Sequence, residues 1–229
     1  NAFEIDQAVL QDLRKTLDTC AESCEEAGVR FDACVYEEDF IAWGSSATRN
    51  DLFSNAVAPF TTVIMNPPYR KIRSDSETRC QLRSAGLETS NLYSGFLALA
   101  ASLLSDGGEL VAITPRSFCN GPYFRPFRER FLANVSLKRI HMFESRAAAF
   151  RADGVLQENV ILYGRKTADK PRNVIVSSSH GPAFSDITER ACLYAEAIVP
   201  DDPEMFIHLV ATESQYEVRQ RICRLDASL

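Results

Sequence analysis

The chain alternates short apolar runs with stretches in which apolar residues recur at helical spacing. Residues 9–24 carry apolar side chains every three or four positions, and Gly28 follows as a helix stop. The same spacing predicts a helix over 92–104, and Pro122 suits the first turn of another helix that runs to Phe131. The apolar runs between these helices predict strands at residues 2–5, 29–36, 57–65, 109–114, 137–143 and 159–163.

This order of strands and helices predicts an α/β fold in which a parallel sheet carries helices on both faces. In such a sheet, ligands bind outside the carboxyl ends of the strands. Three of the predicted strands end in polar or conformationally special residues, at 4–6, 39–40 and 66–69. The alternation fades in the last part of the chain, so we expect one α/β domain over 1–185 and a different kind of segment over 186–229.

The composition is that of a soluble globular protein, since 45% of the 229 residues are hydrophobic and 24% are charged. No apolar stretch is long enough to cross a bilayer, so we expect no membrane partner. The seven cysteines are scattered without a CxxC pair, which indicates reduced thiols and a cytoplasmic protein. Cys20 and Cys24 share a helical face, but no histidine or further cysteine lies nearby, and we expect no metal site.

The charge is unevenly distributed. The chain has a net charge of −6, but residues 66–151 hold 13 Lys and Arg against 7 Asp and Glu, and the rest holds 12 against 24. A basic middle in an acidic chain is compatible with a phosphate-binding surface and equally with a solvated face of mixed charge. Charge therefore permits a nucleic-acid partner without identifying one.

The sequence Asn66-Pro67-Pro68-Tyr69 directly follows the apolar strand predicted at 57–65. Two prolines end a strand, because proline lacks the N–H of a ladder and fixes its φ angle. The Asn66 amide oxygen and the Pro67 carbonyl oxygen can both accept hydrogen bonds from one exocyclic amine, and the Tyr69 ring offers a face on which a planar base can stack. The tetrapeptide is therefore either a strand-ending turn or a motif that aims the lone pair of an amine at an electrophile.

The chain has polar or conformationally special residues at 4–6 and 39–40, followed by Asn-Pro-Pro-Tyr at 66–69. With these three sites in this order, residues 2–166 resemble the N6-adenine DNA methyltransferases of restriction–modification systems, in the arrangement where the cofactor motifs precede the catalytic one. The resemblance implies a Rossmann-like sheet that binds S-adenosylmethionine. "FEID" resembles the motif in which Glu4 would bind the ribose hydroxyls of the cofactor and Ile5 would pack on its adenine ring. "EEDF" resembles the motif in which Asp39 would accept from the adenine amine and Phe40 would border the ring.

The same resemblance makes "NPPY" the catalytic motif, in which Asn66, Pro67 and Tyr69 act on the target amine and Pro68 lines the cofactor site. The segments "NLYSGFLALAASLLSDGGELVAITPRSF" and "VLQENVILYGRK" resemble the helix and strands that follow in the family. The implied reaction transfers a methyl group from S-adenosylmethionine to N6 of adenine in a specific sequence of double-stranded DNA. A restriction subunit or domain is the implied protein partner.

The chemistry of this family requires a flipped adenine, since the amine is inaccessible inside the duplex. Arg70 and Lys71 follow the catalytic motif, where they would clamp phosphates near the extruded nucleotide or lie in a solvated loop. Phe150 precedes the last predicted strand, where some family members place an aromatic ring against the flipped base. A core position is the other interpretation of Phe150.

The chain departs from the family pattern at its beginning. The glycine-rich first motif, which lets the backbone approach the methionine end of the cofactor, should precede "NAFEID", and it is absent from the printed sequence. We therefore expect a fragment, with a methyltransferase catalytic domain over 1–185 that lacks its first strand. Residues 186–229 are then a linker or the start of a target-recognition domain.

Two other functions remain open. Asn-Pro-Pro-Tyr also occurs in methyltransferases that act on ribosomal RNA or on a protein glutamine amide, because these too methylate a planar nitrogen. A non-catalytic DNA-binding or assembly subunit could also keep the fold and lose the cofactor loop. Methylation of plasmid DNA by the full-length gene product, mapped by base, distinguishes these possibilities.

Overall fold

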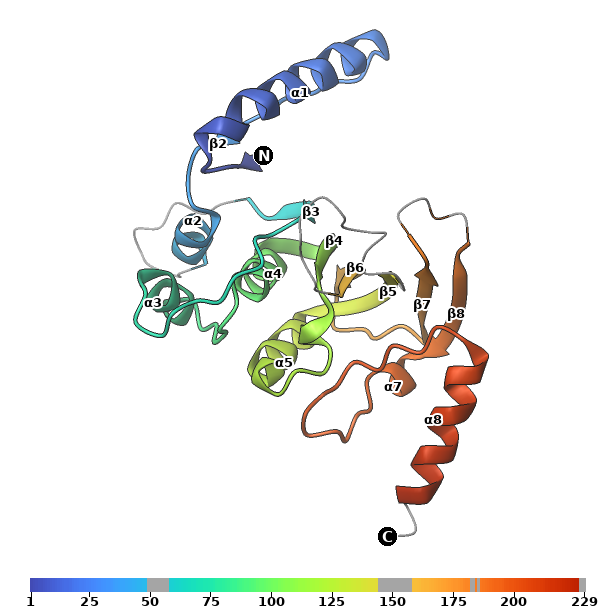
Figure 1. The fold of residues 1–229 in the computed structure, drawn as a ribbon. Helices are drawn as coiled ribbons and strands as arrows, with labels where there is room; N and C mark the ends of the chain where they lie inside the picture. The colour runs from blue at the N-terminus through green and yellow to red at the C-terminus, as the bar shows by residue number, and fades with distance from the viewer. Residues whose placement is uncertain (49–57, 144–157, 182–183, 185, 227–229) are drawn as a thin grey trace.

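The computed structural model of the chain describes residues 1–48, 58–143, 158–181, 184 and 186–226. Its main body is a six-stranded sheet in the order β3-β4-β6-β5-β7-β8 (Figure 1). The strands are β3 (Phe60–Met65), β4 (Leu104–Pro115), β5 (Val135–Phe143), β6 (Asn159–Lys166), β7 (Asn173–Ser179) and β8 (Thr188–Leu193).

The sheet is mixed rather than wholly parallel as expected. Strands β3, β4, β5 and β7 run in one direction, whereas β6 and β8 run in the opposite one. Residues 180–187 join β7 to β8 and are fewer than the roughly dozen that a parallel crossover needs, so this pair forms an antiparallel hairpin. The domain boundary expected after residue 185 falls between these two strands and stays a prediction.

Four helices form a layer against this sheet: α2 (Phe40–Ala47), α3 (Glu77–Ser84), α4 (Leu92–Leu103) and α5 (Arg125–Asn134) (Figure 1). Helix α4 packs on β4 and lies between α2 and α5, so it is enclosed on several sides and forms the centre of the core. None of the described helices combines the length and the apolar character needed to cross a membrane. The chain after β4 also forms short helical turns at Arg116–Phe118 and Pro122–Phe124, and helices α7 (Tyr194–Ala197) and α8 (Glu213–Asp226).

The first part of the chain forms a separate βαβ unit. Strands β1 (Ala2–Phe3) and β2 (Val35–Tyr36) pair in parallel and are joined by α1 (Gln7–Glu26), which projects away from the main body (Figure 1). Helix α1 begins where the Asp6 side chain accepts a hydrogen bond from Ala8 N. The unit is attached to the main body through a cluster of aromatic rings made by Phe3, Tyr36, Phe40, Trp43 and Phe60.

The predicted helices are confirmed as α1, α4 and α5, and each predicted strand overlaps a strand of the structure. Strand β2 occupies only two residues of the expected 29–36. The apolar spacing missed α2, α3, β7 and β8. Helix α3 lies in a polar stretch, where the Ser76 hydroxyl accepts from Arg79 N and supplies a cap that apolar spacing does not detect.

Candidate active site

The four residues Asn66, Pro67, Pro68 and Tyr69 lie at the carboxyl end of β3, next to the carboxyl end of β4. Pro67 is buried and Tyr69 is half-buried, whereas Asn66 and Pro68 are exposed. The Tyr69 hydroxyl lies 2.9 Å from Asn66 Oδ1 and 3.1 Å from the backbone oxygen of Ile113 on β4. Tyr69 therefore connects the exposed amide of the motif to the neighbouring strand.

A second tyrosine supports Tyr69. The ring of Tyr93 on α4 packs against Tyr69 edge-to-face, with centroids 6.3 Å apart and ring planes at 84°. The Tyr93 hydroxyl lies 2.9 Å from Ser117 Oγ in the segment that follows β4. Burial raises the pKa of Tyr93 far above its ordinary value, so its hydroxyl keeps its proton and remains available for this hydrogen bond.

Sequence reasoning selected neither Tyr93 nor Ser117. A signal for Ser117 was present, because this serine follows a strand that ends in Pro115, the same pattern that identified the motif at 66–69. Tyr93 sits in the first turn of a nearly continuous apolar helix, where nothing in the sequence separates a supporting residue from a core residue.

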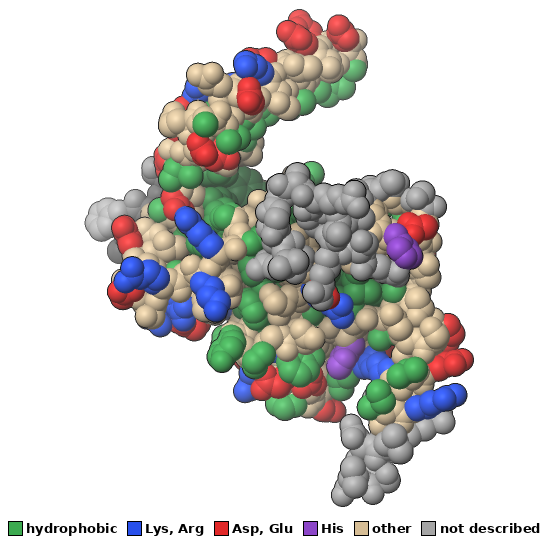
Figure 2. All heavy atoms as spheres, viewed as in Figure 1, with side chains coloured by type: hydrophobic (Ala, Val, Ile, Leu, Met, Phe, Trp, Pro, Cys, Tyr) green, Lys and Arg blue, Asp and Glu red, His purple; other side chains and the backbone are tan. Residues whose placement is uncertain are grey.

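The chain after the motif is held by a short antiparallel contact with the start of α4. Leu92 N donates to Arg70 O at 2.9 Å, and Ile72 N donates to Ser90 O at 2.7 Å. The motif is thus fixed by β3 on one side and by this pairing on the other. The side chains of Arg70 and Lys71 are exposed, and Figure 2 shows Lys and Arg side chains gathered over α3 and the chain that leads to it.

Glu4 follows β1, and its backbone N–H donates to Tyr36 O at 3.1 Å. Its Oε1 accepts from Ile5 N and Asp6 N, both at 2.8 Å. Both bonds end on the same carboxylate oxygen, which orients the group without using Oε2. The neighbouring Ile5 is 63% exposed, so a flat apolar ligand could cover it.

Asp39 is the N-cap of α2, because its Oδ1 accepts from Ile41 N at 2.7 Å and from Ala42 N at 3.3 Å. As with Glu4, both bonds end on one oxygen. Phe40 packs between the two parts of the structure, with its ring centroid 5.2 Å from that of Phe3 and 5.2 Å from that of Phe96. Asp39 therefore has a structural role in addition to the predicted one.

The predicted site residues form two groups. Because β1 and β2 are parallel, Glu4, Ile5, Asp39 and Phe40 follow adjacent strand ends at one edge of the small sheet. The motif at 66–69 and the residues that follow it make up the second group, at the edge of the large sheet. Within the described residues, no hydrogen bond joins the two groups, and Phe150 lies outside the described residues.

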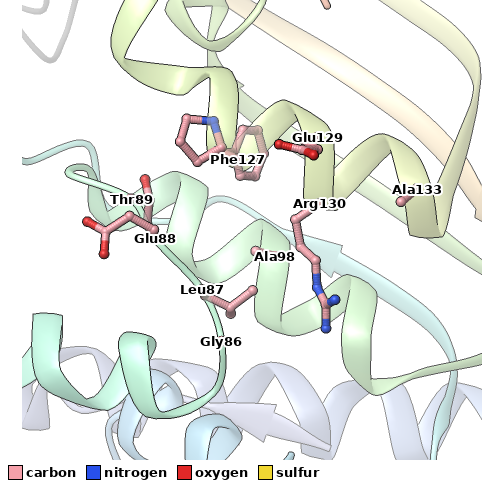
Figure 3. A pocket seen from close by; sticks show the side chains of 10 residues that line it. Gly86, Leu87, Glu88, Thr89, Ala98, Phe127, Glu129, Arg130 and Ala133 are labelled. Atoms are coloured by element: carbon pink, nitrogen blue, oxygen red, sulfur yellow. The ribbon is translucent and has the colours of Figure 1, made fainter.

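A groove of about 360 Å³ lies elsewhere, between α5 and the chain that leads into α4. Figure 3 shows Thr89, Glu129 and Arg130 among the side chains that line it. None of the predicted site residues contributes to this groove, so its volume does not identify it as the active site.

Comparison with known proteins supports the assignment that the motifs suggest. A family model described as Eco57I restriction-modification methylase matches residues 4–150. The type II methyltransferase M.PstI of Providencia stuartii is 40% identical over 227 residues, which are 99% of this chain and 44% of that protein. The type II methyltransferase M.BsuBI of Bacillus subtilis is 42% identical over 225 residues, which are 96% of this chain and 44% of that protein.

The chain thus spans less than half the length of these two relatives. Among solved structures, the M protein of the type I restriction enzyme EcoKI is 13% identical, with a TM-score of 0.50 over 91% of this chain and 42% of that one. This likeness confirms the expected fold class, an α/β Rossmann-like methyltransferase sheet with flanking helices. Because the family model covers well over half of its residues, the chain belongs to the Eco57I restriction-modification methylase family.

Proposed function

We propose that this chain is the catalytic part of an enzyme that methylates N6 of adenine in a specific DNA sequence, with S-adenosylmethionine as methyl donor, in a restriction–modification system. Family membership and similarity to two type II methyltransferases support methyl transfer to DNA. The choice of an exocyclic amine rests on one observation: Asn66 lies exposed at a strand end, with its amide oxygen 2.9 Å from the Tyr69 hydroxyl.

The motif is suited to act on an amine. An amide oxygen can accept two hydrogen bonds, so the Tyr69 hydroxyl can hold Asn66 Oδ1 while a target amine donates to the same atom. The Pro67 carbonyl is the second acceptor, and its position is restricted by the proline rings. When bound, S-adenosylmethionine supplies an electrophilic methyl group. No general base is needed, because the amine loses its proton after it has become cationic.

The cofactor is assigned to the first group of site residues. Glu4 would accept from the ribose hydroxyls with Oε2 and Asp39 from the adenine amine with Oδ2, since the other oxygen of each carboxylate already binds backbone N–H groups. Ile5 and Phe40 would border the adenine ring. Exposed Pro68 would line the cofactor site from the side of the catalytic motif.

Double-stranded DNA with a flipped adenine is the proposed substrate. Tyr69 would stack on the extruded base, and the exposed Arg70 and Lys71 would bind phosphates beside it. Phe150 keeps its proposed role against the flipped base. A restriction endonuclease, as a separate subunit or a fused domain, is the partner that this function implies, and the cytoplasm is the implied location.

The test is methylation of plasmid DNA by the full-length gene product, with the modified base identified and mapped. We expect N6-methyladenine at one short sequence, and none with an Asn66→Ala variant. Methylation of ribosomal RNA or of a protein glutamine, with none on DNA, would contradict the proposed substrate. DNA binding with no methyl transfer to any of the three would instead identify a non-catalytic subunit.

Replacement of Asp39 should weaken cofactor binding more than it affects chemistry. Asp39→Ala removes a charge-assisted hydrogen bond of roughly 1.5–3 kcal/mol, which corresponds to an increase of about 10- to 150-fold in the Kd for S-adenosylmethionine. Because Asp39 also caps α2, the same change should lower stability by about 1 kcal/mol. Calorimetry on the full-length protein measures the affinity, and denaturant unfolding measures the stability.

Two further variants separate these effects. Asp39→Asn keeps an oxygen for the cap but presents an NH₂ group to the cofactor amine, so affinity should fall while stability is retained. Ser76→Ala removes the cap of α3 and should lower stability without changing the affinity. An unchanged affinity in both Asp39 variants would show that Asp39 is not a cofactor ligand.

A further inference from the structure

Arg128 on α5 is fully buried, with 0% of its side chain exposed. Its guanidinium donates to three backbone oxygens, from Nη1 to Phe118 O at 3.0 Å and to Gly121 O at 2.8 Å, and from Nε to Glu204 O at 2.9 Å. A buried charge is unfavourable unless its donors are satisfied. Here Nε and Nη1 are satisfied by two chain segments that lie far apart in the sequence. Among the described residues, Nη2 has no hydrogen-bond partner, and it lies 3.7 Å from Glu204 Oε2 on the second of these segments.

The first segment, residues 116–124, connects β4 to α5. It turns tightly, because Gly121 N donates to Ser117 O at 2.9 Å and a Cβ added at Gly121 would lie only 2.6 Å from that oxygen. The ring of Phe118 is fully buried beneath it. Arg128 binds this turn at two of its carbonyls, which fixes its position relative to α5.

The second segment, residues 202–207, lies beyond the boundary predicted at 185. The Asp202 carboxylate organises it by accepting from Glu204 N at 2.9 Å and from Phe206 N at 2.8 Å. The Arg128 guanidinium lies 5.0 Å from the centroid of the Phe206 ring, in a cation–π contact. The segment also reaches the first one directly, since Ile207 N donates to Cys119 O at 2.8 Å.

The first segment also reaches the catalytic motif. Ser117 Oγ lies 2.9 Å from the Tyr93 hydroxyl, and the Tyr93 ring packs on Tyr69. The Tyr69 hydroxyl in turn lies 2.9 Å from Asn66 Oδ1. A continuous series of contacts therefore runs from residues 202–207, through Arg128 and Ser117, to the amide of the motif.

We propose that Arg128 is a positioning residue for methyl transfer, which couples the segment 202–207 to the pose of Asn66 and Tyr69. It acts through the turn that carries Ser117 and touches neither substrate nor cofactor. This proposal rests on the proposed function. Its consequence is regulatory: a change in the chain beyond residue 185, such as DNA recognition there, alters the geometry of the catalytic motif.

The kinetic test uses Arg128→Lys, which keeps the charge but cannot reproduce the fork of donors that binds separate carbonyls. Small displacements of catalytic groups can lower rates by up to about 10²-fold, so we expect kcat on DNA to fall between about 10- and 10²-fold. The KM values for DNA and for S-adenosylmethionine should change less than about twofold. Arg130→Lys, the same substitution at an exposed site on the same helix, should leave all three unchanged.

Ser117→Ala supplies a second, milder variant that removes the hydroxyl bound to Tyr93. If Arg128 acts through Ser117, the double variant with Arg128→Lys should have the kcat of the slower single variant, not the product of the two losses. Kinetics are measured well below the melting temperature of each variant. A merely structural role for Arg128 would give multiplicative losses, and that result would overturn the proposal.

A measurement independent of methyl transfer separates this proposal from the proposed function. In Arg128→Lys, the backbone amides of Cys119, Gly121 and Ile207 should exchange hydrogen faster, because each donates within the structure that Arg128 holds. Exchange in Arg130→Lys should match the parent protein. If these amides exchange faster in Arg128→Lys but the parent protein methylates nothing, only the proposed function is contradicted. If their exchange in Arg128→Lys is unchanged, the proposed role of Arg128 is overturned.

Discussion

Replacing Asn66 by alanine should lower kcat for methyl transfer by at least about 10²-fold, the scale of loss when one preorganised hydrogen-bonding group is removed from a reacting centre. The bond from the amine to Asn66 Oδ1 strengthens as the nitrogen becomes cationic, so its loss affects the transition state more than the bound substrates. The Kd for S-adenosylmethionine should therefore stay within about threefold of that of the parent protein. Single-turnover rates on the plasmid substrate and calorimetry measure the two quantities.

Asn66 is exposed at a strand end, so its replacement should leave the fold intact. Asn173→Ala is the matched control, because it removes an exposed asparagine at the first residue of β7, away from the motif, and should leave kcat unchanged. Turnover near the parent value in Asn66→Ala would show that the motif is only a strand-ending turn.

The position of the predicted site followed from local chemistry in the sequence. Prolines at 67 and 68 end β3 wherever the rest of the chain lies, and the parallel register then places Asn66 at the same edge as the end of β4. In the same way, Asp39 follows β2 at a helix start. Each strand end is determined by a few adjacent residues. The α/β pattern then predicts that residues which follow the strands lie at the carboxyl edge of the sheet, where ligands bind.

The supporting contacts could not be predicted, because they depend on tertiary packing. Arg128 looks like any charge on an amphipathic helix, yet residues 116–124 and 202–207 come together around it and bury it. Strand β7 was missed for a related reason. Its three serines break the apolar pattern by which the other strands were predicted, yet Ser177 and Ser179 are buried, each with its hydroxyl 3.0 Å from a ring nitrogen of His141 on β5.

The structural hydrogen bonds of two acidic residues were equally impossible to predict from the sequence. The resemblance assigned Glu4 and Asp39 to a cofactor, and nothing in the sequence indicated that one oxygen of each already binds backbone N–H groups. This arrangement changes the meaning of a substitution, because an alanine there removes a structural acceptor together with the proposed ligand. A lower cofactor affinity in such a variant is therefore informative only if the free energy of unfolding of the same variant is also measured.

Tyr69 is the residue whose replacement should separate the two proposed roles of the motif, since its hydroxyl contacts Asn66 and its ring is proposed to stack on the base. Tyr69→Phe removes only the hydroxyl, which lies 2.9 Å from Asn66 Oδ1 and 3.1 Å from Ile113 O. A hydrogen bond of this kind contributes about 1 kcal/mol, so kcat should fall about fivefold while binding of DNA is retained. Tyr69→Ala also removes stacking of roughly 1–3 kcal/mol, and the extruded base should lose its support.

Fluorescence of 2-aminopurine placed at the target adenine reports this extrusion, because the base brightens when it leaves the stack. We expect Tyr69→Phe to keep the fluorescence increase and Tyr69→Ala to lose most of it, with kcat reduced more than about 10²-fold in the alanine variant. Tyr163→Phe is the control, since it also removes one tyrosine hydroxyl hydrogen bond, to Glu109 at 2.6 Å, on strands β6 and β4 away from the motif. If Tyr69→Phe lost the fluorescence increase as fully as Tyr69→Ala, the hydroxyl rather than the ring would hold the base, and the stacking role would be wrong.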